Sequence, residues 1–207
     1  MELINTTDIT GWPEGVLLGY SPLKEGLSTH ILSPDEKKEY QTFSNAQRKQ
    51  EFLSARYLLR MLIEELDIEY GVLELKKEEK GKPYVLLDEQ KVYVSFSHSK
   101  ELVMAAISEQ KDIGLDIETT DRVIDHRIVE RILNEDEWEV AGEEDPIKLW
   151  TIKEAAVKSL GTGLRTNLRD LTIKKIKKNE YSIRFNDDKS FEICNFEELN
   201  HQIALAY

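Results

Sequence analysis

The chain has 207 residues and a mass of 24.0 kDa, and its 40% hydrophobic and 33% charged residues exclude a disordered or collagen-like protein. With 28 Lys and Arg against 40 Asp and Glu, the net charge of -12 argues against nucleic acid or an anionic membrane as the partner. The first residues lack the pattern of a signal peptide, and the longest apolar run, 102–107, is too short to cross a membrane.

Cap signals predict two helices in the first third of the chain. Ser33-Pro34-Asp35-Glu36 combines an N-cap serine, a proline at the first helical position and a capping-box glutamate, which predicts a short helix. A second helix is expected from about Ser44, with Gln47 at its third position. Apolar residues that recur every three or four positions predict its long buried stripe: Phe52, Ala55, Leu59, Leu62 and Leu66.

Three strands are expected next. Alternating apolar and polar residues over 92–97 predict a half-buried strand that leads into Ser97-His98-Ser99-Lys100, and 102–108 is expected to pair back as a hairpin. Residues 112–118 alternate in the same way. The segment Asn134-Glu135-Asp136-Glu137 then repeats the cap pattern found at Ser33.

The last third of the chain contains one helix and a run of short strands. Asp145-Pro146 opens a strong helix that ends at Leu160, and Gly161 is suited to a left-handed C-terminal position. Strands are expected at about 171–176, 181–185, 190–194 and 202–207. The single cysteine, Cys194, cannot form an internal disulfide, which fits a reducing cytoplasm, and we expect it to be a small core residue.

A weak internal repeat suggests how these elements are organised. LSPDE at Leu32 resembles LNEDE at Leu133, and the strand pair from Tyr93 resembles the pair from Phe191. Each pair follows a long helix that is preceded by cap signals. The pattern predicts an α+β fold of two similar halves, 1–109 and 110–207, that face each other. A chance match of short amphipathic patterns is the alternative.

Two acidic residues share one face of the strand at 112–118. Leu115 and Ile117 point to one side, whereas Asp116 and Glu118 point to the other together with Gly114. Two carboxylates in this arrangement can bind one hard cation such as Mg²⁺. The glycine is expected to leave room for a ligand. The alternative is an ordinary solvated strand face.

The helix of 146–160 places chemically active residues opposite its core stripe. Trp150, Glu154 and Lys158 lie on one side, which suggests the wall of a pocket. The alternative is an ordinary Glu–Lys pair one helical turn apart. The opposite side is the predicted core stripe, which consists of Leu149, Ile152, Ala156 and Leu160.

Hydroxyl, imidazole and cationic groups elsewhere in the chain can bind phosphate. Ser97 and His98 sit at a strand end. A hydrolase that combines them with Asp116 is disfavoured, because adjacent strand residues point to opposite faces and the chain lacks a G-x-S-x-G elbow. Three cations can supply positive charge to the same ligand, although ordinary surface positions are the alternative: Arg48, Arg56 and Lys82.

Together these motifs resemble the 4′-phosphopantetheinyl transferases, in particular the surfactin-synthetase-activating type. The matching segments are 81–83, 96–99, 114–118, 150–158 and 161–164, in the order and spacing of that family. The resemblance implies the family's α+β fold with two halves related by a pseudo-twofold axis. It also implies a monomer with one active site between the halves.

The resemblance further implies transfer of phosphopantetheine from coenzyme A (CoA) to a serine of an apo acyl or peptidyl carrier protein, as in holo-acyl-carrier-protein synthases. The products are the holo carrier and 3′,5′-ADP. One Mg²⁺ is implied, held by Asp116, Glu118 and Glu154. Glu154, Lys158 and Asp116 are the implied catalytic residues: Lys158 stabilises or protonates the leaving nucleotide, and Glu154 accepts the serine proton. The residues implied to bind CoA are Arg48, Arg56, Lys82, Ser97, His98, Lys153 and Lys158.

Two other functions are possible for the same residues. The first is a noncatalytic relative that binds CoA or a carrier protein, against which the intact acids and Lys158 argue. The second is an Mg²⁺-dependent pyrophosphate hydrolase, which the three carboxylates permit but nothing else in the chain favours. Product analysis with and without a carrier protein separates these alternatives.

Overall fold

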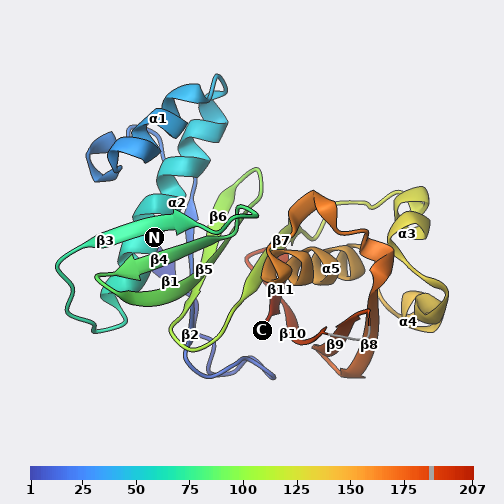
Figure 1. The fold of residues 1–207 in the computed structure, drawn as a ribbon. Helices are drawn as coiled ribbons and strands as arrows, with labels where there is room; N and C mark the ends of the chain where they lie inside the picture. Colours follow the sequence, from blue (N-terminus) through green and yellow to red (C-terminus); the bar gives the residue numbers. More distant parts are fainter. Residues whose placement is uncertain (187–188) are drawn as a thin grey trace.

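Two antiparallel sheets lie next to each other in the computed structural model, which describes residues 1–186 and 189–207 (Figure 1). The first sheet has the strand order β1-β2-β6-β5-β4-β3 and the second β7-β11-β10-β9-β8, so the fold is α+β as predicted. The strands are β1 Glu2–Leu3, β2 Val16–Pro22, β3 Leu73–Lys77, β4 Pro83–Leu87, β5 Gln90–His98, β6 Leu102–Ser108, β7 Gly114–Thr119, β8 Leu171–Lys177, β9 Glu180–Phe185, β10 Lys189–Glu198 and β11 His201–Ala206.

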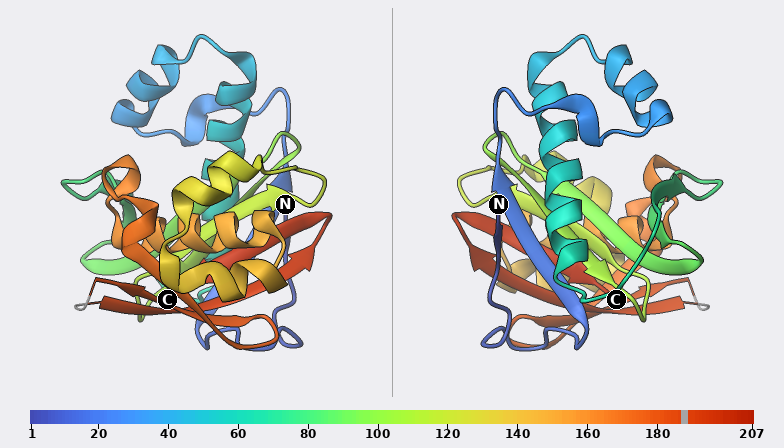
Figure 2. Two further views of the ribbon diagram at one scale, coloured as in Figure 1. Left: turned by 90° about the vertical axis from the view of Figure 1, so that its right-hand side faces the viewer. Right: turned by 90° about the vertical axis from the view of Figure 1, so that its left-hand side faces the viewer.

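Each sheet is covered by one long helix. The α-helices are α1 Pro34–Thr42, α2 Ala46–Glu64, α3 His126–Ile132, α4 Trp138–Glu143 and α5 Pro146–Leu160. Helix α2 packs on β2 and β6, whereas α5 packs on β7 and β11 (Figure 2). Helix α1 contacts β3 through the ion pair of Glu39 with Lys77. Short 3₁₀ helices are η1 Thr29–Ile31, η2 Glu135–Glu137, η3 Gly163–Arg165 and η4 Leu168–Asp170. None of the helices formed by the described residues is long and apolar enough to cross a membrane.

The cap signals are confirmed, with one shift. Ser33 and Glu36 form the predicted capping box, and Gly161 ends α5 with φ of 67°. The second helix starts one residue later than predicted, because Asn45 rather than Ser44 accepts hydrogen bonds from the first free amides. The local chain chemistry therefore determines where these helices begin and end.

The polar face of β5 is buried at Ser95 and Ser97, so the predicted half-buried strand is wrong at this end. Ser95 and Ser97 are only 4% and 5% exposed because β7 lies against them. The Ser95 hydroxyl accepts from the amide of Leu115 at 2.8 Å, and the Ser97 hydroxyl accepts from the amide of Ile117 at 3.2 Å. These two bonds join the sheets and place the Ser-His-Ser segment beside the acidic strand.

A half-buried carboxylate near the start of α5 predicts how stability depends on pH. Burial acts to raise the pKa of Glu144, but hydrogen bonds from Lys175, Lys148 and Tyr181 outweigh it and lower the pKa from 4.5 to about 2. Because the folded pKa is depressed, this stabilisation is complete above pH 4.5 and is lost as the pH falls toward 2. We therefore expect Glu144→Gln to destabilise the protein at pH 7, with a difference from wild type that shrinks below pH 4.5.

Urea denaturation at several pH values measures this difference. The control is Glu143→Gln, since Glu143 is 59% exposed and contacts Lys175 at 3.2 Å. It should change stability by less than about 1 kcal/mol at pH 7. A constant difference between wild type and Glu144→Gln over the whole pH range would contradict the role given to this carboxylate.

Candidate active site

A cleft of about 460 Å³ lies where α2, β5, β7 and α5 meet. Its lining includes the cations Arg48, Arg56 and Lys158 together with the acids Asp116 and Glu118. Ser97 and His98 of β5 also line it, so the lining comes from both sheets and both long helices. The contact between β5 and β7 therefore brings most of the sequence-predicted residues of the two halves to one cleft, although Lys82, Lys153 and Glu154 do not line it.

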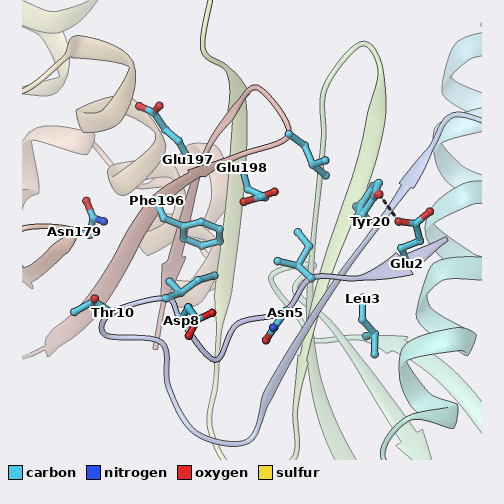
Figure 3. Close-up of a pocket in the computed structure, with 13 residues that line it drawn as sticks. Glu2, Leu3, Asn5, Asp8, Thr10, Tyr20, Asn179, Phe196, Glu197 and Glu198 are labelled. Carbon is cyan, nitrogen blue, oxygen red and sulfur yellow. Dashed lines mark hydrogen bonds between the residues drawn. The ribbon is translucent and has the colours of Figure 1, made fainter.

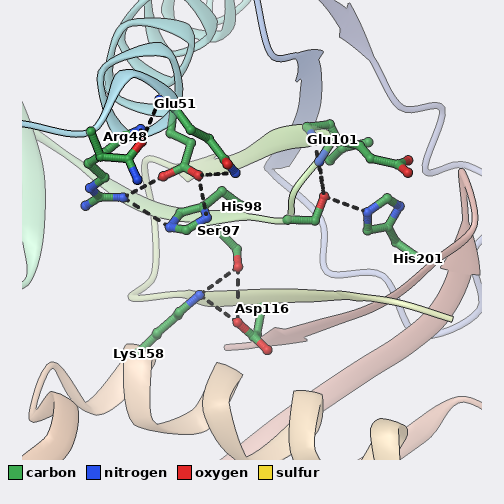
Figure 4. Close-up of polar contacts among 12 residues, drawn as sticks. Arg48, Glu51, Ser97, His98, Glu101, Asp116, Lys158 and His201 are labelled. Carbon is green, nitrogen blue, oxygen red and sulfur yellow. Dashed lines mark hydrogen bonds and ion pairs between the residues drawn. The ribbon is translucent and has the colours of Figure 1, made fainter. Parts of the chain in front are cut away.

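The floor of the cleft is a hydrogen-bonded group of three side chains (Figure 4). The Lys158 ammonium lies 2.7 Å from Asp116 Oδ1 and 2.9 Å from Ser97 Oγ, and it also donates to the Phe96 carbonyl at 3.3 Å. The Ser97 hydroxyl donates to Asp116 Oδ1 at 3.1 Å. Its only proton is thus committed to Asp116, so Ser97 orients the acid and the lysine rather than offering a free donor to phosphate.

Lys158 has a different partner from the one its helix spacing suggests. The alternative interpretation from sequence was an ordinary pair with Glu154, but Lys158 forms its ion pair with Asp116 across the contact between α5 and β7. Trp150, Glu154 and Lys158 do share the partly exposed side of α5, as predicted. The helix therefore presents these three residues toward the acids of β7.

The other two acids lie close to Asp116. Burial raises the pKa of Glu154, and the neighbouring charge of Asp116 raises it further. Glu118 Oε1 accepts from the indole of Trp150 at 3.2 Å and forms an ion pair with Arg122. Three carboxylates thus gather at the junction of β7 and α5, with the cations Lys158 and Arg122 beside them.

The donor set fits a hard cation such as Mg²⁺. Asp116 Oδ2 is buried and has no hydrogen-bond partner among the described residues, which is unusual for a carboxylate oxygen. The pKa of Glu154 is raised because its burial and the charge of Asp116 outweigh the cations Lys158 and Arg122, and a bound cation would offset this cost. Within residues 1–186 and 189–207, however, no three acidic, histidine or cysteine side chains are already arranged to hold an ion. The magnesium site therefore stays a prediction that the chemistry of these residues supports.

Basic and aromatic residues of α2 form one wall of the cleft. Arg48 Nη1 lies 3.1 Å from both Glu51 Oε2 and His98 Nε2, and because arginine only donates, His98 Nε2 is the acceptor. Burial lowers the pKa of His98, so its ring is neutral at pH 7. Arg56 stacks 4.0 Å above the ring of Phe52. This wall holds three of the predicted CoA-binding residues: Arg48, Arg56 and His98.

Lys82 lies beside the cleft, but its charge is already paired. It lines an adjoining hollow of about 210 Å³ and is 7% exposed. Its ammonium forms an ion pair with Asp112 and donates to the carbonyl of Ser159, and burial lowers its pKa. Through Ser159, Lys82 holds the end of α5 next to the start of β4. Lys82 could bind phosphate only if its contacts with Ser159 and Asp112 were broken.

Lys153 is not a ligand-binding residue, so that prediction is wrong. Its side chain is fully buried on the inner side of α5, and its ammonium contacts Glu137 Oε2 at 2.7 Å. It also donates to the carbonyls of Ile132, Leu168 and Leu171, at 2.6, 2.9 and 2.8 Å. Lys153 therefore connects α5 to the segments that surround it, and a nucleotide cannot reach it.

Gly114 does not leave room for a ligand, so that prediction is wrong. A Cβ atom at this position would lie 2.1 Å from the carbonyl oxygen of Ala155 and 2.3 Å from the amide nitrogen of Ser159. The space beside the acids is thus filled by the backbone of α5 rather than left open for a ligand. The glycine permits the close approach of helix and strand that brings Lys158 to Asp116.

The close contact between Gly114 and the backbone of α5 predicts the effect of replacing this glycine by alanine. Gly114→Ala should lower the free energy of unfolding by about 1–3 kcal/mol or more, because the clash is with backbone and α5 must move away from β7. The folded fraction should also lose activity, since Lys158 moves with the helix. Urea denaturation and initial rates measure the two effects. Gly142→Ala, with open space around its Cβ, is the control, and equal behaviour of the two variants would contradict the packing argument.

A larger hollow of about 580 Å³ lies elsewhere, between the N-terminal segment and the β10–β11 turn (Figure 3). Its lining includes Glu2, Asp8, Glu197 and Glu198, and the described residues that line it include no lysine, arginine or histidine. Such a surface repels phosphate groups. The hollow is therefore a poor candidate for the nucleotide site despite its size.

Several residues of the site were missed from sequence. Glu51 holds Arg48 and lies one helical turn after it, and Arg122 stands four residues after Glu118. Ser95 lies two residues before Ser97 and therefore on the same face of β5. The sequence spacing places each of these residues beside a predicted site residue. Only the fold shows that the faces that carry them pack against other parts of the protein.

Comparison with known proteins agrees with this geometry. A family model described as the 4′-phosphopantetheinyl transferase superfamily matches residues 112–207, and a model for the N-terminal part of a 4′-phosphopantetheinyl transferase matches residues 20–110. The chain belongs to the 4′-phosphopantetheinyl transferase family. The first matched segment contains Asp116, Glu154 and Lys158, and the second contains Arg48 and His98.

Named relatives come from distant organisms. The chain is 31% identical over 157 residues to the 4′-phosphopantetheinyl transferase gsp of Aneurinibacillus migulanus, covering 72% of this chain and 64% of that protein. It is 26% identical over 164 residues to the L-aminoadipate-semialdehyde dehydrogenase-phosphopantetheinyl transferase of Homo sapiens, covering 70% and 53%. A holo-acyl-carrier-protein synthase of Staphylococcus carnosus is 26% identical over 92 residues, covering 41% and 79%. The matches thus span less than two thirds of the first two relatives.

Proposed function

We propose that this protein transfers the 4′-phosphopantetheine group of CoA to a serine hydroxyl of an apo carrier protein, with Mg²⁺ bound. One observation carries the proposal: the ammonium of Lys158 is fixed by Asp116 and Ser97 at the floor of a cleft whose wall holds Arg48 and His98. A fixed cation at the base of a cleft that also holds Arg48 and Arg56 suits a substrate with a pyrophosphate group. Family membership supports the same reaction.

The residues in the cleft and Glu154 beside it would divide the chemistry among them. The carrier serine oxygen forms a bond to the phosphorus that bears the pantetheine arm, while the bond from that phosphorus to the leaving 3′,5′-ADP breaks. Glu154 accepts the serine proton, directly or through one water. Lys158 stabilises the negative charge that grows on the leaving oxygen and can protonate it. Arg48, Arg56 and His98 bind the phosphates of the nucleotide.

Asp116, Glu118 and Glu154 would hold the metal ion. Bound there, Mg²⁺ supplies a positive charge that neutralises the pyrophosphate oxygens. The unpartnered Asp116 Oδ2 supports this assignment. Ser97 keeps Asp116 oriented through its hydroxyl, and Trp150 does the same for Glu118 through its indole.

Release of 3′,5′-ADP tests this function against its alternatives. Purified protein is incubated with CoA and Mg²⁺, with or without an apo carrier, and the nucleotide products are separated. We expect 3′,5′-ADP only when the carrier is present. Release without a carrier would indicate a pyrophosphate hydrolase, and binding of CoA without any product would indicate a noncatalytic relative.

We also expect the protein to be a monomer. Both walls of the cleft, α2 with β5 and α5 with β7, come from one chain, so a second copy is not needed to complete the site. Light scattering should give a mass near 24.0 kDa at micromolar concentration. A stable trimer would contradict this prediction.

A further inference from the structure

His201 is a buried histidine outside the cleft that contacts both halves of the chain. It lies at the start of β11 and is 0% exposed. Its Nδ1 lies 2.6 Å from the carbonyl oxygen of Leu199, and because a carbonyl only accepts, Nδ1 carries the ring proton. The Nε2 lone pair therefore accepts the hydroxyl of Ser99 at 2.9 Å (Figure 4). The structure thus connects the β10–β11 turn to the β5–β6 turn.

Ser99 organises the turn that follows His98. Its hydroxyl oxygen accepts from the amides of Glu101 at 3.1 Å and Leu102 at 3.3 Å, and its own amide donates to the Leu102 carbonyl at 2.9 Å. The one proton of this hydroxyl goes to His201. Consecutive strand residues point to opposite sides, so Ser99 faces His201 while His98 faces Arg48 in the cleft.

The same β10–β11 turn also holds the acidic strand. The carbonyl of Asn200 accepts from the Thr120 amide at 2.9 Å and from the Thr120 hydroxyl at 3.2 Å, just beyond the end of β7. In the ladder between β11 and β7, His201 lies opposite Thr119. The β10–β11 turn therefore fixes both the strand that carries Asp116 and the turn that follows His98.

We propose that His201 is a positioning residue that fixes the His98 ring in the cleft by holding Ser99. The inference rests on the proposed function, in which His98 contacts the phosphates of CoA. His201 itself is buried and does not line the cleft, so any effect on CoA must pass through Ser99 and its neighbour. Loss of the contact should weaken CoA binding and leave the reacting groups on α5 and β7 in place.

Steady-state kinetics with varied CoA test this proposal. His201→Ala should raise the KM for CoA about five- to tenfold and change kcat less than about twofold, as expected when a hydrogen bond to a charged group is weakened. His201→Gln keeps an acceptor for Ser99 and should restore most of the KM. If His201→Ala does not fold, Ser99→Ala removes the same bond from its other end and should raise the KM alike.

Two comparisons separate positioning from simple stabilisation. Gln202→Ala changes the next residue, which is 2% exposed and whose side chain donates to Asn195 and Phe196 of its own hairpin, so it should lower stability without raising the KM. In a His98→Ala background, His201→Ala should have little further effect on the KM, because the residue that it positions is gone.

The outcomes are distinct. If Gln202→Ala raises the KM as much as His201→Ala, or if the effect of His201→Ala persists in full without His98, the positioning role is overturned while the proposed function stands. If the wild-type protein modifies no carrier, the proposed function fails first, and this inference fails with it.

Discussion

Lys158→Ala is expected to lower the kcat of phosphopantetheine transfer by about 10²- to 10³-fold, which corresponds to about 2.7–4 kcal/mol of transition-state stabilisation. The reason is geometric. The ammonium is held by Asp116, Ser97 and the Phe96 carbonyl at the floor of the cleft, so it is oriented before substrate arrives. A cation fixed in advance stabilises developing charge without having to reorganise. Initial rates at saturating CoA and carrier measure the loss.

A second lysine of the same helix provides the control. Lys148 forms an ion pair with Glu144 one turn away, at 2.9 Å, and lies at the opposite end of α5 from Lys158. Lys148→Ala should keep kcat within about twofold of wild type while it removes the same charge from the same helix. Equal losses in the two variants, in proportion to lost stability, would show that Lys158 is only structural.

Lys153→Met should lower the free energy of unfolding by about 3–5 kcal/mol, because it leaves the buried Glu137 carboxylate without its countercharge. Both side chains are almost completely buried, at 0% and 1% exposure, so water cannot compensate. Glu137 would keep the amides of Asn134 and Ile173 as donors but would lose its only cation among the described residues. Urea denaturation at pH 7 gives the free energy.

The companion variant and a binding measurement test the same assignment. Glu137→Gln breaks the pair from its other side and should also be strongly destabilising. Any folded fraction of Lys153→Met should bind CoA with a dissociation constant within about twofold of wild type, since the cleft is formed by other residues. A stable Lys153→Met protein that binds CoA weakly would restore the ligand-binding role predicted from sequence.

Features that depend on neighbours along the chain could be predicted from sequence. The capping box of Ser33 and Glu36, the helix end at Gly161 and the shared face of Asp116 and Glu118 all follow from local spacing. The side of α5 that carries Glu154 and Lys158 follows in the same way. The four residues Asp116, Glu118, Glu154 and Lys158 form the central part of the candidate site.

Features that depend on contacts between distant segments could not be predicted in this way. Helical periodicity gives no sign that Lys153 is buried against Glu137, because its partners include carbonyls of Leu168 and Leu171 beyond the end of the helix. Polar alternation in β5 suggested a solvated face, whereas its serines accept hydrogen bonds from β7. Strand β2 was not predicted at all, although it pairs along the whole length of β6.

The intact mass of a carrier protein tests the central claim most directly. A panel of apo acyl and peptidyl carriers is incubated with the protein, CoA and Mg²⁺, beside carriers whose acceptor serine is replaced by alanine. We expect at least one carrier to gain the mass of a single phosphopantetheine group, with no gain for its alanine variant or when Lys158→Ala replaces the wild type over the same short time. Unchanged masses across the panel, from folded protein that binds CoA, would contradict the assignment of this cleft to phosphopantetheine transfer.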